Sequence, residues 1–332
     1  MGCGKIAKKH INALEQIKGA RLAAVCDINP QNLLTFAKEN GISSYTDYTS
    51  FLKNADIDAV IICTPSGLHT SMGQKAAEAG KHILVEKPFT LDIDQGKKLI
   101  ELCKLKGVKL GVVHPNRAKK IVKALKKAVD NGWFGKITHA SAVLRWNRSE
   151  EYYNAAAWRG TIKLDGGILF NQAIHNIDLL NWLIGPVDEV FAYSEKMLRK
   201  IEYEDVCVCT LKFKNGALGI IEAAVTLYPE NLEESLSVFG SHGTAVLTGK
   251  TLSKIEKWKF SCITDDEAES NIEQLNNKIN LAGHKLVIED FIQAINQNRE
   301  PLVSGNRAIE VLQLINAIYQ SANLKLPVKL QE

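Results

Sequence analysis

The stretch Gly2-Cys3-Gly4-Lys5-Ile6-Ala7 stands almost at the start of the chain and decides the fold of its first third. Its spacing fits the glycine-rich turn that joins a strand to a helix and carries a dinucleotide. The first glycine makes the turn, and the second lets the backbone approach a pyrophosphate. The small Ala7 lets the helix meet the sheet, so that the helix N-terminus faces the phosphates.

Asp27 strengthens this interpretation, because it ends the next predicted strand roughly 20 residues after the glycines. A carboxylate there can accept the hydrogen bonds of an adenosine ribose. Its charge would repel a ribose phosphate, and no arginine follows it, so NAD is favoured over NADP. The alternative is that Asp27 caps the helix that begins near Pro30.

The residues up to about 118 alternate strands with helices, which predicts a parallel, doubly wound sheet and a Rossmann domain over 1–118. The predicted strands are 21–26, 58–63, 82–86 and 109–114, and the predicted helices are 30–38, 74–79 and 92–106. The glycine turn should follow a buried strand of about 5–6 residues, yet only Met1 precedes it. We therefore expect the first, central strand to be missing, through a misassigned start or a truncation.

The pattern changes after residue 120, where longer strands alternate polar with apolar residues. The Lys214-Asn215-Gly216 turn is typical of a hairpin between two of them. This predicts a second, α+β domain over 119–332 with a large, mostly antiparallel open sheet, a helix over 169–183, and two closing helices near 283–297 and 306–322. A one-sided sheet exposes apolar area, so we expect a homodimer or homotetramer.

Composition excludes several classes of protein. The 332 residues carry a net charge of +4, and the lysine-rich run 119–127 has the spacing of a solvated helix face, so no nucleic acid is expected. No apolar run approaches the roughly 20 residues that cross a bilayer, and no signal core is present, which predicts a cytoplasmic protein without membrane contact. The seven cysteines are scattered, and Cys207 and Cys209 share one strand face without a second ligand pair, so no metal is expected.

Two segments carry candidate chemistry. Glu86-Lys87-Pro88 closes a predicted strand at the carboxyl edge of the parallel sheet, where ligands of such folds bind. On the predicted helix after Gly166-Gly167, Asn171, His175 and Asp178 fall on one face at i, i+4 and i+7. The two glycines would let a ligand approach the positive end of this helix. The alternatives are an ordinary surface Glu-Lys pair and a histidine satisfied within the core.

A third segment is rich in aromatic residues and arginine: Arg145-Trp146-Asn147-Arg148, Tyr152-Tyr153 and Trp158-Arg159-Gly160. Aromatic rings stack on sugars and bases, and arginine binds carboxylate or phosphate through two parallel hydrogen bonds. A loop that covers the site without touching a ligand is the alternative.

Together these motifs resemble the glucose–fructose oxidoreductase/inositol dehydrogenase family, in order over nearly the whole chain. The resemblance implies that Lys87 and His175 carry the hydride-transfer chemistry, His175 taking the hydroxyl proton while Lys87 holds the same oxygen. Many members have an aspartate in place of Asn171, so a proton relay there is doubtful. The residues that the resemblance and the fingerprint assign to NAD are Gly2, Gly4, Lys5, Ile6, Asp27, Thr64, Pro65, Ser66, His69, Glu86, Lys87, Asn116 and Arg117.

Within this family, the segments 145–153, 157–160, 165–167 and 171–178 are most similar to members that oxidise the 3-hydroxyl of UDP-N-acetylglucosaminuronate for lipopolysaccharide synthesis. The implied substrate-binding residues are Lys87, Arg148, Tyr152, Trp158, Arg159, Asn171, Gln172 and His175. An inositol or free-sugar dehydrogenase is the second hypothesis, and it predicts no dependence on Arg148 or Arg159. A non-catalytic, NAD-binding regulator on the same fold is the third.

Overall fold

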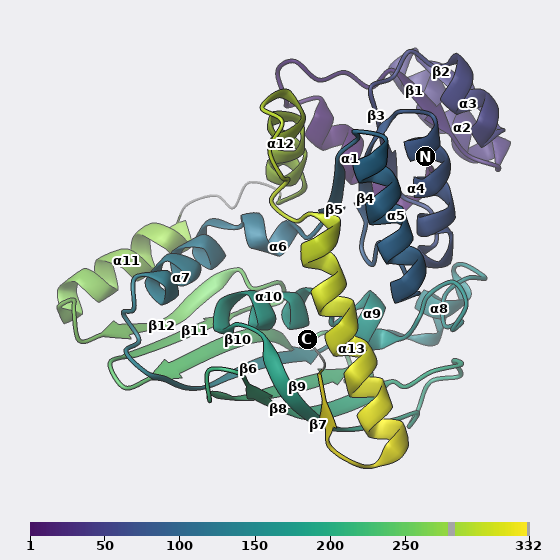
Figure 1. Cartoon of the computed structure of the whole chain (residues 1–332). Coiled ribbons are helices and arrows are strands. Elements are labelled where there is room, and N and C mark those ends of the chain that lie inside the picture. Colours follow the sequence, from purple (N-terminus) through teal and green to yellow (C-terminus); the bar gives the residue numbers. More distant parts are fainter. Residues whose placement is uncertain (278–282, 331–332) are drawn as a thin grey trace. The chain divides into compact units, whose positions relative to one another are not determined.

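The computed structural model describes residues 1–277 and 283–330, which form two compact units (Figure 1). The first unit comprises Met1–Pro115 with Leu281–Glu310, and the second comprises Asn116–Asn280 with Val311–Glu332. The sequence placed the boundary after residue 118 and assigned everything beyond it to the second domain. The structure differs from this prediction because the chain returns to the first unit after residue 280. Each unit is described by itself.

The first unit alternates short parallel strands with helices. Its strands are β1 (Ala24–Cys26), β2 (Ser43–Tyr45), β3 (Ala59–Ile62), β4 (His82–Glu86) and β5 (Leu110–Val113). Its helices are α1 (Lys5–Leu14), α2 (Pro30–Asn40), α3 (Tyr48–Asn54), the 3₁₀ turn η1 (Ser66–Leu68), α4 (His69–Glu78), α5 (Ile93–Leu105) and α12 (Gly283–Asn296). In β4, Ile83, Leu84 and Val85 are all buried, as expected of a strand covered on both faces.

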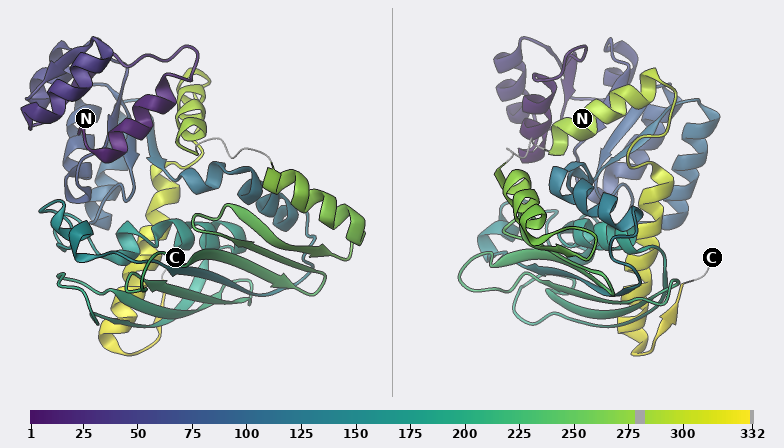
Figure 2. Two further views of the ribbon diagram at one scale, coloured as in Figure 1. Left: turned by 180° about the vertical axis from the view of Figure 1, so that it is seen from behind. Right: turned by 90° about the vertical axis from the view of Figure 1, so that its left-hand side faces the viewer.

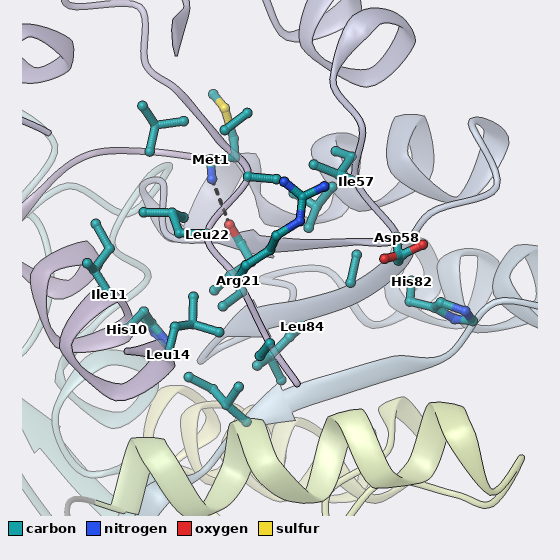
Figure 3. A pocket seen from close by; sticks show the side chains of 18 of the residues that line it. Met1, His10, Ile11, Leu14, Arg21, Leu22, Ile57, Asp58, His82 and Leu84 are labelled. Atoms are coloured by element: carbon teal, nitrogen blue, oxygen red, sulfur yellow. Dashed lines mark hydrogen bonds between the residues drawn. The ribbon is translucent and has the colours of Figure 1, made fainter. Parts of the chain in front are cut away.

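The parallel sheet of this unit is divided into two pieces. β1 pairs with β2, and β3, β4 and β5 form a separate sheet. Between the pieces, Met1 and Gly2 bridge only the carboxyl ends of the facing strands: Gly2 N donates to Cys26 O at 2.8 Å, and the Met1 amino group donates to Ile61 O at 2.8 Å (Figure 3).

The rest of the gap is a cavity of about 880 Å³. Apolar side chains from α1, β1, β4 and α12 line much of it, among them Val25 and Phe291. Figure 3 shows two others, Ile11 and Leu84. Among the described residues, the β1–β2 pair and the β3–β4–β5 sheet are therefore separated by a cavity.

The second unit is built on one sheet of eight strands in the order β12-β11-β10-β6-β9-β8-β7-β13. All neighbours are antiparallel except β6 and β9, which makes the sheet mostly antiparallel, as predicted. Its strands are β6 (Ile137–Arg145), β7 (Val187–Glu195), β8 (Val206–Phe213), β9 (Leu218–Ala224), β10 (Glu233–Gly240), β11 (Gly243–Thr248), β12 (Lys254–Phe260) and β13 (Val328–Lys329).

Helices gather on one face of this sheet (Figure 2). They are α7 (Lys120–Asp130), α8 (Glu150–Asn154), α9 (Ile168–Asn171), α10 (Ile174–Ile184) and α11 (Asp265–Asn277); α6 (Pro115–Ala118) joins the units, and α13 (Gly305–Leu324) begins in the first unit and continues in the second. The helix expected over 169–183 is divided, because Ala173 N donates to Ile168 O, five residues back, and the turn there widens.

The strands alternate between a buried and an exposed face. Cys207 and Cys209 are buried on the covered face, as their spacing predicts. On the other face, the apolar side chains of Tyr193, Val208 and Ile220 are 59%, 48% and 48% exposed. Of the helices in residues 1–277 and 283–330, none is long and apolar enough to cross a membrane.

Candidate active site

The glycine-rich turn has the geometry that a dinucleotide requires. Gly2 has a φ of +84°, and a Cβ at this position would lie 2.9 Å from the carbonyl of Cys63. Only glycine fits there without strain. Gly4 is the N-cap of α1 and makes no side-chain cap, and no heavy atom lies within 4 Å of its ideal Cβ. The space beside Gly4 is therefore open at the N-terminus of α1, where the helix dipole favours the approach of an anion.

The carboxylate of Asp27 lies against this turn and is buried. Its Oδ2 accepts a hydrogen bond from Cys3 N at 2.7 Å, and its Oδ1 accepts from Asn29 N at 2.8 Å. The bond from Asn29 N closes a local turn just before α2, which resembles the helix-capping alternative. The first bond places the carboxylate beside the glycine turn, which is also where a ribose-binding role needs it.

The residues predicted around the end of β3 are organised by His69. Its two ring nitrogens lie 2.7 Å from Pro88 O and 2.8 Å from Thr64 O, and the ring is buried. His69 thus connects the turn after β3 to the cis Lys87–Pro88 peptide after β4. Pro65 and Ser66 begin η1, in the short segment between Thr64 and His69.

The carboxylate of Glu86 is held on both sides. Its Oε1 lies 2.7 Å from His10 Nε2, and its Oε2 accepts from Lys87 N at 3.3 Å. Burial alone would lower the pKa of His10, but contacts with Cys63 and Glu86 outweigh it and raise the pKa to about 10. Burial alone would raise the pKa of Glu86, but the His10 hydrogen bond lowers the pKa to about 2. His10 and Glu86 therefore form a buried ion pair, and Glu86 directly precedes Lys87 in the sequence.

In the second unit, the buried Asp178 on α10 is paired with an arginine of α6. Its carboxylate forms a bidentate ion pair with Arg117, at 2.7 and 2.8 Å, and both side chains are buried. The Arg117 guanidinium also lies 5.0 Å from the centre of the Trp182 ring. Arg117 therefore ties α6 to α10, and its predicted contact with NAD stays a prediction. His175 is half-buried one turn before Asp178 on α10.

Five side chains of the aromatic segment form a stack that we call the arginine–aromatic ladder: Trp146, Arg148, Tyr152, Arg159 and Trp158. The guanidinium carbon of Arg148 lies 4.4 Å from the Trp146 ring and 5.1 Å from the Tyr152 ring. The guanidinium carbon of Arg159 lies 4.2 Å from the same Tyr152 ring and 5.5 Å from the Trp158 ring. Distances of this size are typical of cation–π stacking.

The ladder concentrates positive charge, and no carboxylate among the described residues is hydrogen-bonded to it. The two guanidinium groups donate hydrogen bonds to neutral oxygens of Asn147, Asn231 and Tyr152. The Nε atoms of Arg148 and Arg159 are buried and have no hydrogen-bond partner among the described residues. Burial also lowers the pKa of Arg148. Because stacked guanidinium groups keep their N–H edges for acceptors, the ladder is suited to bind an anion.

The residues around Asn171 form a second polar group beside the ladder. Asp165 is fully buried and accepts hydrogen bonds from Tyr203 at 2.5 Å, from Gly160 N at 2.9 Å and from the side-chain amide of Asn171. Gln172 Nε2 lies 3.4 Å from the Tyr152 hydroxyl, and the buried Gln172 Oε1 has no partner among the described residues. Gln172 thus contacts the ladder, whereas the Asn171 amide is directed to Asp165.

The sequence suggested that Gly166-Gly167 let a ligand approach the helix end, and the structure corrects this. The positive end of α9 is occupied by Glu204, whose carboxylate accepts from Ile168 N at 3.0 Å and from Tyr319 at 2.6 Å. A Cβ on Gly167 would lie 2.2 Å from the Tyr319 hydroxyl. The glycine therefore makes room for protein atoms. Sequence reasoning missed Glu204 because it lies 36 residues beyond Ile168.

A unit with the turn that carries a dinucleotide, joined in one chain to an α+β unit, is the organisation of an NAD-dependent oxidoreductase. Comparison with known proteins also identifies an oxidoreductase. The family model described as oxidoreductase family, NAD-binding Rossmann fold, matches residues 1–114, and that of the GFO/IDH/MocA C-terminal domain matches residues 122–246. The chain belongs to this family.

Three relatives show where in the family the chain lies. The WlbA dehydrogenase from Bordetella pertussis, solved in complex with NADH and UDP-GlcNAcA, is 36% identical, with a TM-score of 0.95 over 100% of this chain and 96% of that chain. WlbA from Chromobacterium violaceum, in the same kind of complex, is 35% identical, with a TM-score of 0.93 over 99% and 94%. Myo-inositol 2-dehydrogenase from Thermotoga maritima is 29% identical over 100% of this chain and 98% of its own length.

Proposed function

We propose that this NAD-dependent oxidoreductase oxidises the 3-hydroxyl of UDP-N-acetylglucosaminuronate to a ketone. The observation that carries the proposal is the arginine–aromatic ladder, which offers rings for stacking and two guanidinium groups for an anion. This substrate has a uracil base, a sugar ring, a diphosphate and a carboxylate. The likeness to two structures that hold UDP-GlcNAcA supports the same choice.

The chemistry divides between the two units. Bound NAD supplies an acceptor for the hydride that leaves the ring carbon. His175 takes the proton of the reacting hydroxyl, and the Lys87 ammonium donates a hydrogen bond to the same oxygen and stabilises its developing negative charge. The contacts of His69 and Glu86 around the Lys87–Pro88 turn orient Lys87. Asn171, which donates to Asp165, positions the substrate-binding segment and does not relay the proton.

In this proposal, the ladder binds the negatively charged part of the substrate. An anion there could accept hydrogen bonds from the Nε–H groups of Arg148 and Arg159, which have no partner among the described residues. Its negative charge would also offset the desolvation of the Arg148 guanidinium. A charged hydrogen bond of this kind contributes about 1.5–3 kcal/mol. An uncharged inositol could not use it, so the ladder favours a sugar nucleotide over the inositols on which relatives such as myo-inositol 2-dehydrogenase act.

We also propose that the protein assembles into a homodimer or homotetramer through the exposed face of β7, β8 and β9. Tyr193, Val208, Leu218 and Ile220 give this face an apolar surface that a second copy would cover. Light scattering after gel filtration tests this, and a monomer at all concentrations would contradict it. The seven free cysteines suit a reducing cytoplasm, where the product would serve lipopolysaccharide synthesis.

A substrate series tests the proposed activity. NADH formation is measured with UDP-N-acetylglucosaminuronate, with UDP-N-acetylglucosamine, which lacks the carboxylate, and with myo-inositol. We expect activity with the uronate, weaker activity without the carboxylate and none with inositol. Mass spectrometry should show a product lighter by two hydrogen atoms. Activity with inositol alone would favour the free-sugar hypothesis, and bound NADH without turnover on any of the three would favour the regulator.

A further inference from the structure

Three side chains of types that bind metals meet in the first unit. They are His10 on α1, Glu86 at the end of β4 and His284 on α12, and we call them the His10–Glu86–His284 cluster. Their ligand atoms all lie within 4.8 Å of one another. His10 Nε2 lies 2.7 Å from Glu86 Oε1, and His284 Nε2 lies 3.8 Å from the same oxygen.

The donor set suits zinc. Two imidazoles and one carboxylate form a known three-ligand zinc set, in which a fourth, open position holds water. Ligands about 2.0–2.1 Å from a tetrahedral ion lie about 3.3 Å from one another. The distances of 2.7 and 3.8 Å from Glu86 Oε1 to the two histidines bracket this value, and the third distance, between the histidines, is within 4.8 Å, so the side chains would move toward a common centre on binding the ion.

The surroundings of the cluster favour an ion over bulk water. The side chains of His10, Glu86 and His284 are 3%, 10% and 16% exposed. Glu86 Oε2 accepts from Lys87 N, which holds the carboxylate and leaves Oε1 as the ligand. His10 also lines the 880 Å³ cavity, which gives an ion a route inward.

We propose that the His10–Glu86–His284 cluster is a zinc site that joins α1, β4 and α12. A bound ion would replace the proton shared between His10 and Glu86 and would draw His284 toward them. The three segments are far apart in the sequence, so the ion would act as a cross-link within the first unit. This inference does not depend on the substrate that the protein acts on.

The test is a metal titration of the whole chain after chelator treatment. Zn²⁺ is titrated by calorimetry, and Co²⁺ is used as a spectroscopic probe of the ligands. We expect one ion per chain, a tetrahedral Co²⁺ spectrum in the visible range without a thiolate band in the near ultraviolet, and a higher Tm with Zn²⁺. His284→Gln should weaken Zn²⁺ binding at least about tenfold.

His242→Gln is the matched control, because His242 is an exposed histidine of the second unit, and its Zn²⁺ affinity should equal that of the parent protein. Circular dichroism of each variant verifies the fold. Absence of Zn²⁺ binding, unchanged binding in His284→Gln, or a thiolate-to-cobalt band would each overturn the proposal. The first two results would mean that His10 and Glu86 form only an ion pair, and the third would assign the metal to cysteine.

Discussion

The guanidinium groups of Arg148 and Arg159 both lie over the single ring of Tyr152, at 5.1 and 4.2 Å from its centre. Two like charges in one stack repel each other, and among the described residues no acidic side chain is hydrogen-bonded to either of them. An anionic ligand would relieve this repulsion, which is why we assign the ladder to the substrate.

If the ladder binds the substrate, removing one of its arginines should weaken substrate binding. Arg159→Ala should raise the KM for UDP-N-acetylglucosaminuronate about 10- to 100-fold, because about 1.5–3 kcal/mol of charged hydrogen bonding is lost. The affinity for NADH should not change, and kcat should fall much less than KM rises. Steady-state kinetics and NADH fluorescence check both. Arg307→Ala, at an exposed arginine, is the control; an unchanged KM in Arg159→Ala would remove the ladder from substrate binding.

Two glycines of the cofactor turn should respond differently to alanine. Gly2→Ala places a Cβ 2.9 Å from the Cys63 carbonyl at a φ of +84°, so it should cost about 1–3 kcal/mol of stability. Gly4→Ala meets no atom within 4 Å and should cost at most about 1 kcal/mol, yet its Cβ stands where the pyrophosphate would approach. Urea unfolding and NADH titration separate the two effects. Undiminished NADH affinity in Gly4→Ala would argue against this placement of the cofactor.

The cavity between β1 and β3 should accept an additional strand. About five apolar, β-branched residues joined ahead of Met1 could pair with both facing edges and fill much of the 880 Å³. Burying several such side chains should raise Tm by roughly 5 °C or more. A glycine–serine segment of equal length is the control. Equal Tm values for the two extended chains would show that the cavity does not bind a strand.

Glu204 predicts a pH dependence of stability. Burial raises its pKa from 4.5 to about 7, so the folded state holds this proton more tightly than the unfolded state does. Stability from this group is fully present below pH 4.5 and is lost as the pH rises through about 7, by an amount on the order of 3 kcal/mol.

Glu204→Gln keeps an acceptor for Ile168 N and removes the titration, so its free energy of unfolding should fall less than that of the parent between about pH 5 and about pH 8. Urea unfolding at several pH values measures this. The control is Glu256→Gln, at an exposed position of the same unit. Parallel pH profiles for Glu204→Gln and the parent would contradict the assignment.

Local patterns predicted much of the fold. Strand–helix alternation before residue 118 and two-residue periodicity after it correspond to the observed parallel and mostly antiparallel sheets. Patterns of single segments could not predict that α12 returns to the first unit, because its apolar face does not specify which surface it covers. They also could not predict the break between α9 and α10, which depends on a hydrogen bond at Ala173.

Local sequence patterns also predicted only part of the candidate site. The composition of 145–160 indicated arginine and aromatic contacts, and the structure arranges them as one ladder. The helical spacing places His175 and Asp178 one turn apart on α10, but it could not predict that Asp178 pairs with Arg117, which lies far away in the sequence. The His10–Glu86–His284 cluster has no spacing pattern, since its members come from three distant segments.

Lys87 and His175, in the proposed function, carry the oxidation of a UDP-sugar by NAD. NADH absorbance is measured on mixing NAD and UDP-N-acetylglucosaminuronate with the parent chain, Lys87→Ala and His175→Ala, after NADH binding has been established for each. We expect reduction by the parent and a loss of at least about 100-fold in kcat for both variants. Full activity in either variant, or no reduction by a parent chain that binds NADH, would contradict it.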